Sequence, residues 1–559
     1  MNYFRIGGFF SAGVLLCCSM QALAAAVQPV LPDAGQSLRE IAPESRLLPQ
    51  YSGRVPLPIS GDVNAAAPAP GGDKIKVSRF DISGARLFPV ARLQALLQSY
   101  CGQELDLAGL YAVAQKITIF YRQQGYLLAR AWLPAQDVQQ GVVKLVILEG
   151  YYQQVQLQNH SQVRDGVFSQ FLKAFPEKSP VDANVLQRQL LLLDDIPGVV
   201  IHSTLRPGSQ TGYSDLEVEA TSGERVRAQV GSDNWGERFT GAIRAFASAD
   251  LLNPLGLGDH LNAYVMDTQY GGTKYGRASY DVGTGGSGVR WGTSYERLNY
   301  LLAQDYNALH AYGSADTSSI YGLWPWIRRR ETNVTLQITY DHRILHDEVA
   351  SVGSSDAKWF QVGTLSLNGS QQFDRGQMAL WNMSVTHGDL QLDPETLLHD
   401  RMSYNTAGAY NKLNIDGSLL WPVWQDWSVF GHVQGQRAAK NLDLAEKISL
   451  GGPNGVRAYP MGEVQADDAV TGTMELRYNW STAMQLWVFC DAGYGHSSHQ
   501  PMATDVLNRR SIAGPGVGGS LEIAKGLSMR TDWAWPAGSP AISAPTERPT
   551  IWWRVTQSF

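Results

Sequence analysis

Hydrophobic and polar residues alternate along the last ten positions of the chain, residues 550–559. Four apolar side chains share one face of a strand with this period: Ile551, Trp553, Val555 and Phe559. The opposite face carries Thr550, Arg554, Thr556 and Ser558. A strand with one apolar and one polar face is typical of the wall of a lipid-facing barrel, although a strand of a soluble sheet can show the same period.

Similar alternation recurs from about residue 224 to the end, interrupted by clusters of Gly, Asn, Asp and Pro. A spacing of about 20 residues for each strand and connection predicts about 16 strands. The last five are expected at 471–480, 485–494, 511–523, 527–535 and 550–559. Their connections are alternately short and long, as in outer-membrane barrels with short periplasmic turns and long external loops. The C-terminus is therefore predicted to be periplasmic.

Residues 73–222 carry a different pattern, because helical spacing appears between the alternating stretches. A strand at 75–82 precedes helices at 89–100 and 107–124 and strands at 127–133 and 142–148. The same β-α-α-β-β order repeats with a strand at 155–157, helices at 165–175 and 182–194, and strands at 200–205 and 216–220. Two copies of one module of about 75 residues are predicted.

The N-terminus reads as an export signal followed by a linker. Arg5, an apolar run at 6–16 and the small-residue site at 22–24 predict a signal peptide over 1–24. Residues 25–72 are rich in Pro, Ala and Gly. Within them Asp33 and Gln36 have the spacing of a capping box, which predicts a short helix that Pro43 ends.

Composition narrows the class of protein. The chain holds 56 Gly, 16 Trp and 24 Tyr in 559 residues, with no apolar run near the roughly 18 residues of a helical span. A membrane protein of this kind must be a β-barrel. The net charge of -6 offers no basic surface for nucleic acid. We expect no enzyme, because the sequence lacks a GxSxG elbow, an HExxH site and a Walker loop, and we predict no catalytic residues, metal or cofactor. The GxGxxG match at 514–519 lies within an alternating strand and is interpreted as glycines of the barrel wall.

Two motifs then give the chain a family resemblance. Val456-Arg457-Ala458-Tyr459 lies in a connection expected to be external and resembles the VRGY motif in the sixth external loop of two-partner secretion transporters, the TpsB family of the ShlB and FhaC type. Ala458 departs from the usual Gly. The segment 489–493 resembles the F-x-D-x-G motif of the thirteenth strand. The terminal Phe559 resembles a membrane-insertion signal, and the two N-terminal copies resemble POTRA domains.

The resemblance implies a fold and a set of interacting residues. Two periplasmic POTRA domains, at 73–150 and 151–222, precede a 16-stranded barrel at 223–559, with the sixth loop around 445–470. That loop is expected to fold into the lumen, where Arg457 pairs with Asp491 and, secondarily, Glu475. Alternation places these carboxylates inward, together with Phe489 and Gly493. Tyr459 and Phe489 would pack beside the pair, and the N-terminal helix resembles a pore plug.

The resemblance also implies a function. The expected protein is an outer-membrane pore that captures one large unfolded exoprotein of the TpsA type through its POTRA domains and exports it without nucleotide hydrolysis. Its other expected partners are outer-membrane lipids and, during biogenesis, the barrel assembly machinery. Two alternatives stay open: an assembly factor for barrel proteins and a passive porin. The sequence leaves open whether the exported partner is an adhesin, a cytolysin, a contact-dependent inhibitor or an iron-acquisition protein.

Overall fold

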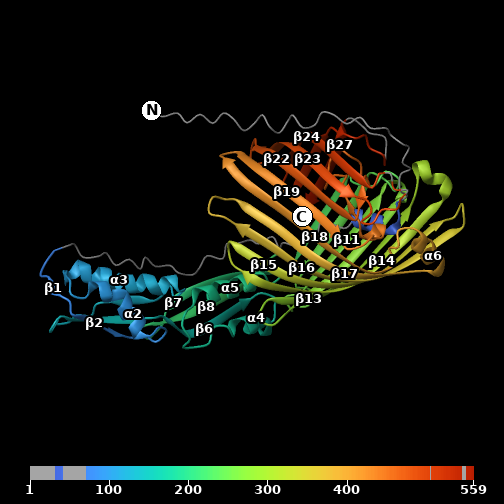
Figure 1. Cartoon of the computed structure of the whole chain (residues 1–559). Coiled ribbons are helices and arrows are strands. Elements are labelled where there is room, and N and C mark those ends of the chain that lie inside the picture. The colour runs from blue at the N-terminus through green and yellow to red at the C-terminus, as the bar shows by residue number, and fades with distance from the viewer. Residues whose placement is uncertain (1–31, 42–70, 504, 506, 544–548) are drawn as a thin grey trace, which may run out of the picture.

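The computed structural model describes residues 32–41, 71–503, 505, 507–543 and 549–559, and it shows two α/β modules joined to a closed antiparallel barrel (Figure 1). Sixteen long strands form the wall, as the sequence predicts, and β27 pairs with β9 to close it. The strands are β9 (Val226–Asp233), β10 (Arg244–Leu252), β11 (His260–Thr268), β12 (Thr273–Thr284), β13 (Val289–Leu301), β14 (Ala311–Arg328), β15 (Thr332–Val349), β16 (Ser354–Gln372), β17 (Met378–Leu392), β18 (Gly408–Trp424), β19 (Trp427–Ala438), β22 (Asp468–Asn479), β23 (Met484–His496), β24 (Arg509–Ala524), β25 (Leu527–Ala534) and β27 (Thr550–Ser558).

Strand alternation sorts the wall residues into two faces. On β23, Trp487, Phe489 and Asp491 are buried, whereas Val488 and Cys490 between them are exposed to the outside. This matches the predicted orientation, because successive side chains of a strand point to opposite faces. No helix in the described part of the chain has both the length and the apolar character needed to span a membrane.

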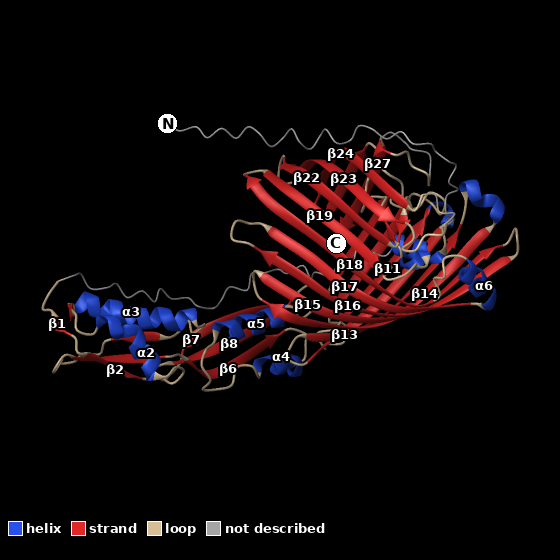
Figure 2. Ribbon diagram, viewed as in Figure 1, coloured by secondary structure: helices blue, strands red, loops and turns tan. Residues whose placement is uncertain are grey.

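The first module is a three-stranded sheet, in the order β2-β5-β4, covered by helices (Figure 2). Its elements are β1 (Ile75–Lys76), β2 (Arg79–Ser83), α2 (Val90–Leu97), η1 (Gln98–Tyr100), β3 (Glu104–Leu105), α3 (Leu107–Gln123), β4 (Arg130–Trp132) and β5 (Val142–Leu148). The single strand predicted at 75–82 is wrong. It divides because β1 pairs with β3, whereas β2 pairs in parallel with β5.

The second module repeats this plan in the order β6-β8-β7. It comprises β6 (Tyr151–His160), α4 (Asp165–Leu172), α5 (Ala183–Asp194), β7 (Val199–Pro207) and β8 (Tyr213–Ser222). Gly125 joins the modules, because its carbonyl accepts a 2.9 Å hydrogen bond from the Ala183 amide. Its φ of +96° and the Asn184 side chain, 2.8 Å from where a Cβ would lie, both favour glycine here.

The second module rests on the short turns of the barrel. Arg328, at the end of β14, donates two 2.8 Å hydrogen bonds to the Asp195 carboxylate. Arg188 donates a 2.8 Å bond to the Pro325 carbonyl. A Cβ on Gly286 would lie 2.2 Å from the Gln170 carbonyl oxygen, so backbone meets backbone at this turn. Both modules therefore lie on the side of the barrel that carries the short turns (Figure 1).

A short helix, α1 (Ala34–Ile41), lies inside the barrel against β13, β14 and β15. The Asp33 carboxylate accepts a 2.8 Å bond from the Gln36 amide, so the predicted cap is confirmed. The helix has eight residues, in line with the short helix expected. The predicted signal peptide at 1–24 and most of the linker at 25–72 lie outside the described residues.

Candidate functional site: loop 6 inside the barrel

The connection between β19 and β22, residues 439–467, is the sixth connection at the end of the barrel opposite the two modules, and we call it loop 6. It contains η4 (Leu444–Glu446) and a small pairing of β20 (Ile448–Ser449) with β21 (Gln465–Ala466). Val456, Ala458 and Tyr459 are completely buried, and only 3% of Arg457 is exposed. The tip of the loop therefore packs inside the barrel and does not extend into solvent.

Arg457 and Asp491 form the contact at the centre of this site. The Arg457 Nε and Nη2 atoms donate to the two Asp491 carboxylate oxygens at 2.9 and 2.8 Å. The Arg457 amide donates to the same carboxylate at 3.0 Å. Because a guanidinium fork matches a carboxylate in the plane, this contact fixes the orientation of the loop as well as its charge.

Two further carboxylates complete the cluster. Arg457 Nη1 donates to Glu475 Oε1 at 2.8 Å and to Asp532 Oδ1 at 3.0 Å. Arg477 and Arg530 donate to the outer oxygens of Glu475 and Asp532 at 2.7 and 2.8 Å. Three arginines thus balance three carboxylates. We call Arg457, Asp491, Glu475 and Asp532 the latch.

Burial alone would lower the pKa of the Arg457 guanidinium, because water no longer solvates the charge. The hydrogen bonds from the guanidinium to Asp491, together with the charges of Asp491, Glu475 and Asp532, raise this pKa above its ordinary value instead. The latch therefore holds a permanently charged group among compensating charges.

Aromatic side chains shield the latch from water. The Arg457 guanidinium carbon lies 3.4 Å from the centre of the Phe489 ring, a cation–π contact. The indole Nε1 atoms of Trp487 and Trp552 donate to Asp532 at 2.8 Å and to the Arg457 carbonyl at 2.7 Å. Tyr459 belongs to the same buried apolar cluster as Phe489, and its hydroxyl donates to the Ser539 carbonyl at 2.7 Å.

Three inward-facing glycines of β24, Gly514, Gly516 and Gly518, make room for these groups, and we call them the glycine face. A Cβ on Gly514 would lie 2.3 Å from the Ala458 Cβ, and one on Gly516 would lie 2.1 Å from the Phe489 ring. On Gly518 it would lie 2.3 Å from Trp487 Nε1. The GxGxxG match is thus part of the wall, as predicted, and its glycines also provide the space that loop 6 occupies.

Loop 6 also contacts α1. Lys358 on β16 bridges the carboxylates of Asp33 and Asp443 at 2.9 and 3.0 Å. These two residues cap α1 and η4, respectively. A Cβ on Gly35 would lie 2.3 Å from the Ala445 Cβ, so the helix and the loop are in direct contact.

A second set of charges holds η4 to the wall. The Glu446 carboxylate forms ion pairs with Arg343 at 2.7 Å and with Lys412 at 2.6 Å. Burial would raise the pKa of this carboxyl, but the charges of Lys412 and Arg343 lower it to about 2. Glu446 is therefore ionised at every physiological pH.

Two carboxyl groups have raised pKa values, in contrast to Glu446, where α1 meets the loop at 234–243. Glu40 on α1 and Glu237 in the loop line one small cavity together with Arg244. Desolvation raises the pKa of Glu40 to about 7. Desolvation and the neighbouring Glu40 raise the pKa of Glu237 to about 8.

The structure brings together Arg457, Asp491, Glu475 and Phe489, the residues that the sequence singles out for the lumen. Gly493 also belongs to the site, because a Cβ there would lie 3.1 Å from Val456. Phe559 lies apart at the seam, where its amide donates to the Ala228 carbonyl at 2.9 Å. Its role in insertion, and the role of the latch in gating, stay predictions.

Sequence reasoning missed Asp532 and Trp552. Both lie in strands that were predicted, at positions that alternation turns inward. The available signal was this alternation, but no motif pointed to either residue.

Comparison with known proteins gives the site its context. A family model described as haemolysin secretion/activation protein ShlB/FhaC/HecB matches residues 212–521, more than half of the chain. A second, described as POTRA domain, ShlB-type, matches residues 75–150.

Two curated relatives match along nearly the whole chain. The heme/hemopexin transporter protein HuxB of Haemophilus influenzae (strain 86-028NP) is 25% identical over 575 residues, covering 100% of this chain and 99% of its own. The outer membrane transporter CdiB of Dickeya dadantii is 24% identical over 577 residues, covering 98% and 99%.

A solved structure, CdiB from Escherichia coli, shares the fold with a TM-score of 0.71 at 22% identity, covering 90% of this chain and 94% of that one. With the closed barrel, the two modules and the matching family models, the chain belongs to the ShlB/FhaC/HecB family of outer-membrane secretion transporters, with its POTRA domains in the periplasm.

Proposed function

We propose that this chain exports one large exoprotein, captured unfolded in the periplasm, through a lumen that α1 and loop 6 occupy at rest. The observation that carries the proposal is the lumen itself. A helix near the N-terminus and a loop from the C-terminal third of the chain lie inside it, and Lys358 joins their caps. A chain in transit requires both to move.

Capture would occur at the edges of the POTRA sheets. The strand orders β2-β5-β4 and β6-β8-β7 leave two strands at the edges of each sheet. An extended chain can add to such an edge through main-chain hydrogen bonds, with modest demands on its sequence. The exoprotein is therefore expected to arrive unfolded.

The latch would set the resting position of loop 6. Arg457 and Asp491 hold the tip of the loop against β23, with Glu475 and Asp532 as further partners. Removing one member of a buried charge cluster costs about 3 to 5 kcal/mol, because the remaining charges lose their compensation. Transport would then use a conformational change without catalysis or nucleotide hydrolysis, with folding of the exoprotein outside the cell giving direction.

An assembly factor for barrel proteins is the alternative of a different kind. It would share the barrel and the POTRA fold, but its substrate would enter the membrane and not the medium. The match over nearly the full length of HuxB, CdiB and this chain supports the secretion function. For its own biogenesis, the chain would use the barrel assembly machinery of its host, with Phe559 as the signal.

The test is deletion of the chain in its native host, followed by comparison of proteins in the medium with those held in the periplasm. We expect one large protein to disappear from the medium while other outer-membrane barrels stay at normal levels. A general fall in barrel proteins would instead identify an assembly factor. Complementation with the wild-type chain is the control.

A further inference from the structure

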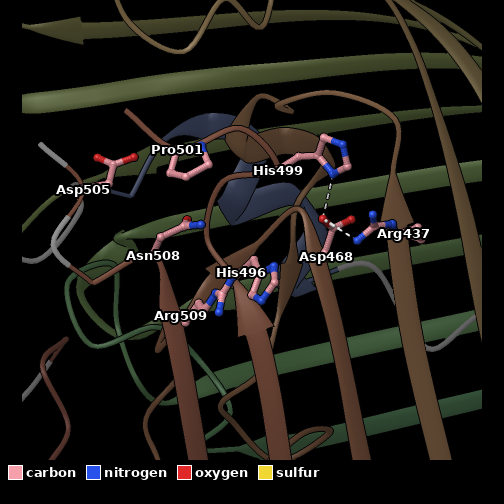
Figure 3. Close-up of a pocket in the computed structure, with 8 residues that line it drawn as sticks. All are labelled: Arg437, Asp468, His496, His499, Pro501, Asp505, Asn508 and Arg509. Carbon is pink, nitrogen blue, oxygen red and sulfur yellow. Dashed lines mark hydrogen bonds and ion pairs between the residues drawn. The ribbon is translucent and has the colours of Figure 1, made fainter. Parts of the chain in front are cut away.

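A row of polar side chains crosses four neighbouring strands at the outer end of the barrel. Asp468 on β22 pairs in register with His496 on β23, which pairs with Arg509 on β24. On the other side, Gln436 of β19 pairs with Ala469, so Arg437 comes next to Asp468 and donates to it at 3.1 Å. Figure 3 shows the four residues around one pocket.

This row faces away from the lumen. Asp491 on β23 points inward, and His496, five positions later, falls on the opposite face of the strand. Two outward residues nearer the middle of the wall, Val470 and Tyr494, are each 45% exposed. Tyrosine is common where the apolar region of a membrane meets the headgroups. The row therefore lies at the level of the outer-leaflet headgroups, directly outside the lipid-facing belt.

Four residues that follow β23 form a pocket together with this row. His499, Pro501, Asp505 and Asn508 line it (Figure 3). Both carboxylates already have donors. Asp468 accepts from the Ala438 amide and His499 at 2.8 Å each, besides Arg437. Asp505 accepts from the Tyr404 hydroxyl and the Met502 amide, both at 2.9 Å.

The side chains of the two arginines of the pocket, Arg437 and Arg509, have fewer hydrogen-bond partners among the described residues than its carboxylates. The side chain of Arg437 is 66% exposed although it touches Asp468. No carboxylate among the described residues lies within ion-pair distance of Arg509, which lines the same pocket. Two guanidinium groups and two histidines thus surround a space whose own acidic groups are occupied, and this favours an added anion with several oxygens.

We propose that this pocket binds the phosphate of an outer-leaflet glycolipid of the lipid A type, with Arg437 and Arg509 as the two forks. A guanidinium recognises phosphate through paired hydrogen bonds. The pocket's position beside the exposed Val470 and Tyr494 supplies a surface for acyl chains, which a free anion would not use.

Such a lipid would lie next to loop 6. The His499 amide donates to Asp467, the last residue of loop 6, at 2.9 Å, and Lys447 of loop 6 bonds to the same carboxylate at 2.9 Å. Bound lipid would therefore stabilise the segment around His499 and the base of loop 6 together.

The experiment uses the full chain in detergent micelles and measures retained lipid by native mass spectrometry. The probes are diphosphoryl lipid A, the same lipid without phosphate, and inorganic phosphate. The variant is R437Q/R509Q. The matched control is R375Q, because Arg375 is an exposed arginine in the short turn between β16 and β17, at the other end of the barrel.

We expect wild-type and R375Q protein to retain diphosphoryl lipid A, and the double variant to bind it at least about tenfold more weakly, because it loses two charge-assisted contacts. Lipid without phosphate should bind as weakly to the wild type, and excess inorganic phosphate should not displace the diphosphoryl lipid. Undiminished binding by R437Q/R509Q would overturn the site. Complete displacement by inorganic phosphate would show a free-anion site and overturn the assignment to lipid.

Discussion

Loop 6 and α1 both occupy the lumen, yet they are held there in different ways. Val456, Ala458 and Tyr459 of the loop are completely buried in an apolar cluster, and the latch beneath them balances its charges. The helix contributes two buried side chains, Ala34 and Leu38, to the apolar core, and the half-buried Ile41 packs against it. Loop 6 is therefore held by packing and paired charge together, whereas α1 depends mainly on polar contacts.

The surroundings of α1 include polar groups that are not satisfied. Within the part of the chain that the structure describes, Arg39 Nη1 and Asp347 Oδ2 are buried without a hydrogen-bond partner. Glu40 meets a second carboxyl group, Glu237, across a small cavity. A buried polar atom without a partner costs about 1 to 3 kcal/mol. Because loop 6 buries more apolar side chains than α1 and carries the latch, we expect α1 to leave the lumen first.

The largest effect should come from the latch. Arg457→Ala leaves Asp491, Glu475 and Asp532 close together with only Arg477 and Arg530 to balance them. We expect the barrel to insert normally while export of the exoprotein falls at least about tenfold, since the loop loses about 3 to 5 kcal/mol of anchoring. Secreted exoprotein per inserted barrel is the measurement, with Arg375→Ala as control. Normal export by the inserted variant would contradict a gating role.

The packing of loop 6 can be broken while its charges stay intact. Gly514→Ala places a Cβ 2.3 Å from the Ala458 Cβ and 2.6 Å from the Trp535 carbonyl oxygen. We expect export to fall several-fold, and the exposure of loop 6 to protease to rise. Adding Ala458→Gly should restore part of the loss, because it removes one of the two clashes. If the double variant is no better than Gly514→Ala, packing against Ala458 is not the cause.

Lys358→Met tests the connection between helix and loop. The substitution leaves Asp33 and Asp443 facing each other without a shared cation. We expect α1 to leave more readily and ion conductance in planar bilayers to rise a few-fold, while loop 6 stays in place through the latch. A variant that lacks residues 34–41 should conduct at least as well, and Lys358→Met should add nothing to it. Unchanged conductance in Lys358→Met would mean that Lys358 does not hold α1.

The smallest effect should be a dependence on pH. With α1 in place, the pKa of Glu40 is about 7 and that of Glu237 about 8. When α1 leaves and the glutamates become exposed to water, their pKa values return to about 4.3. The docked state therefore binds more protons, so docking is strongest below about pH 4.5 and weakens as pH rises through 7 to 8.

Conductance should accordingly increase between pH 5 and pH 8, and Glu40→Gln should flatten this increase, because the amide cannot ionise. Bilayer recordings across this range are the measurement, with Glu522→Gln as control, since Glu522 is an exposed residue far from α1 in the strand order. A wild-type channel with no dependence on pH would show that the two carboxyls do not oppose docking.

Much of the fold could be predicted because it rests on local pattern. Alternation gave the last five strands and the inward position of Asp491 and Glu475. The motif around Arg457 then named its partner. Asp532 satisfies the same alternation, but its contact with Arg457 spans 75 residues and depends on how four strands align. The register between neighbouring strands is set when the barrel closes, so the sequence of a single strand does not predict it.

The position of α1 is a further case. Its capping box was visible in Asp33 and Gln36, but its contacts include residues more than 300 positions away, such as Asp347 and Lys358. A helical period in the sequence predicts that a helix forms, but it does not predict which strands of the barrel that helix contacts. The role of the glycine face was hidden for a similar reason, because the neighbours of Gly514 come from loop 6 and from β25 and its end.

The origin of the partners of Arg457 has a consequence for how the protein is built. They come from β22, β23, β25 and β27, which all follow Arg457 along the chain, and the glycine face of β24 lies among them. The tip of loop 6 cannot reach its final position until these strands have paired. Loop 6 can therefore dock only in a barrel whose last strands have already paired. In a barrel whose final hairpins have slipped in register, these partners would be displaced and loop 6 would stay undocked.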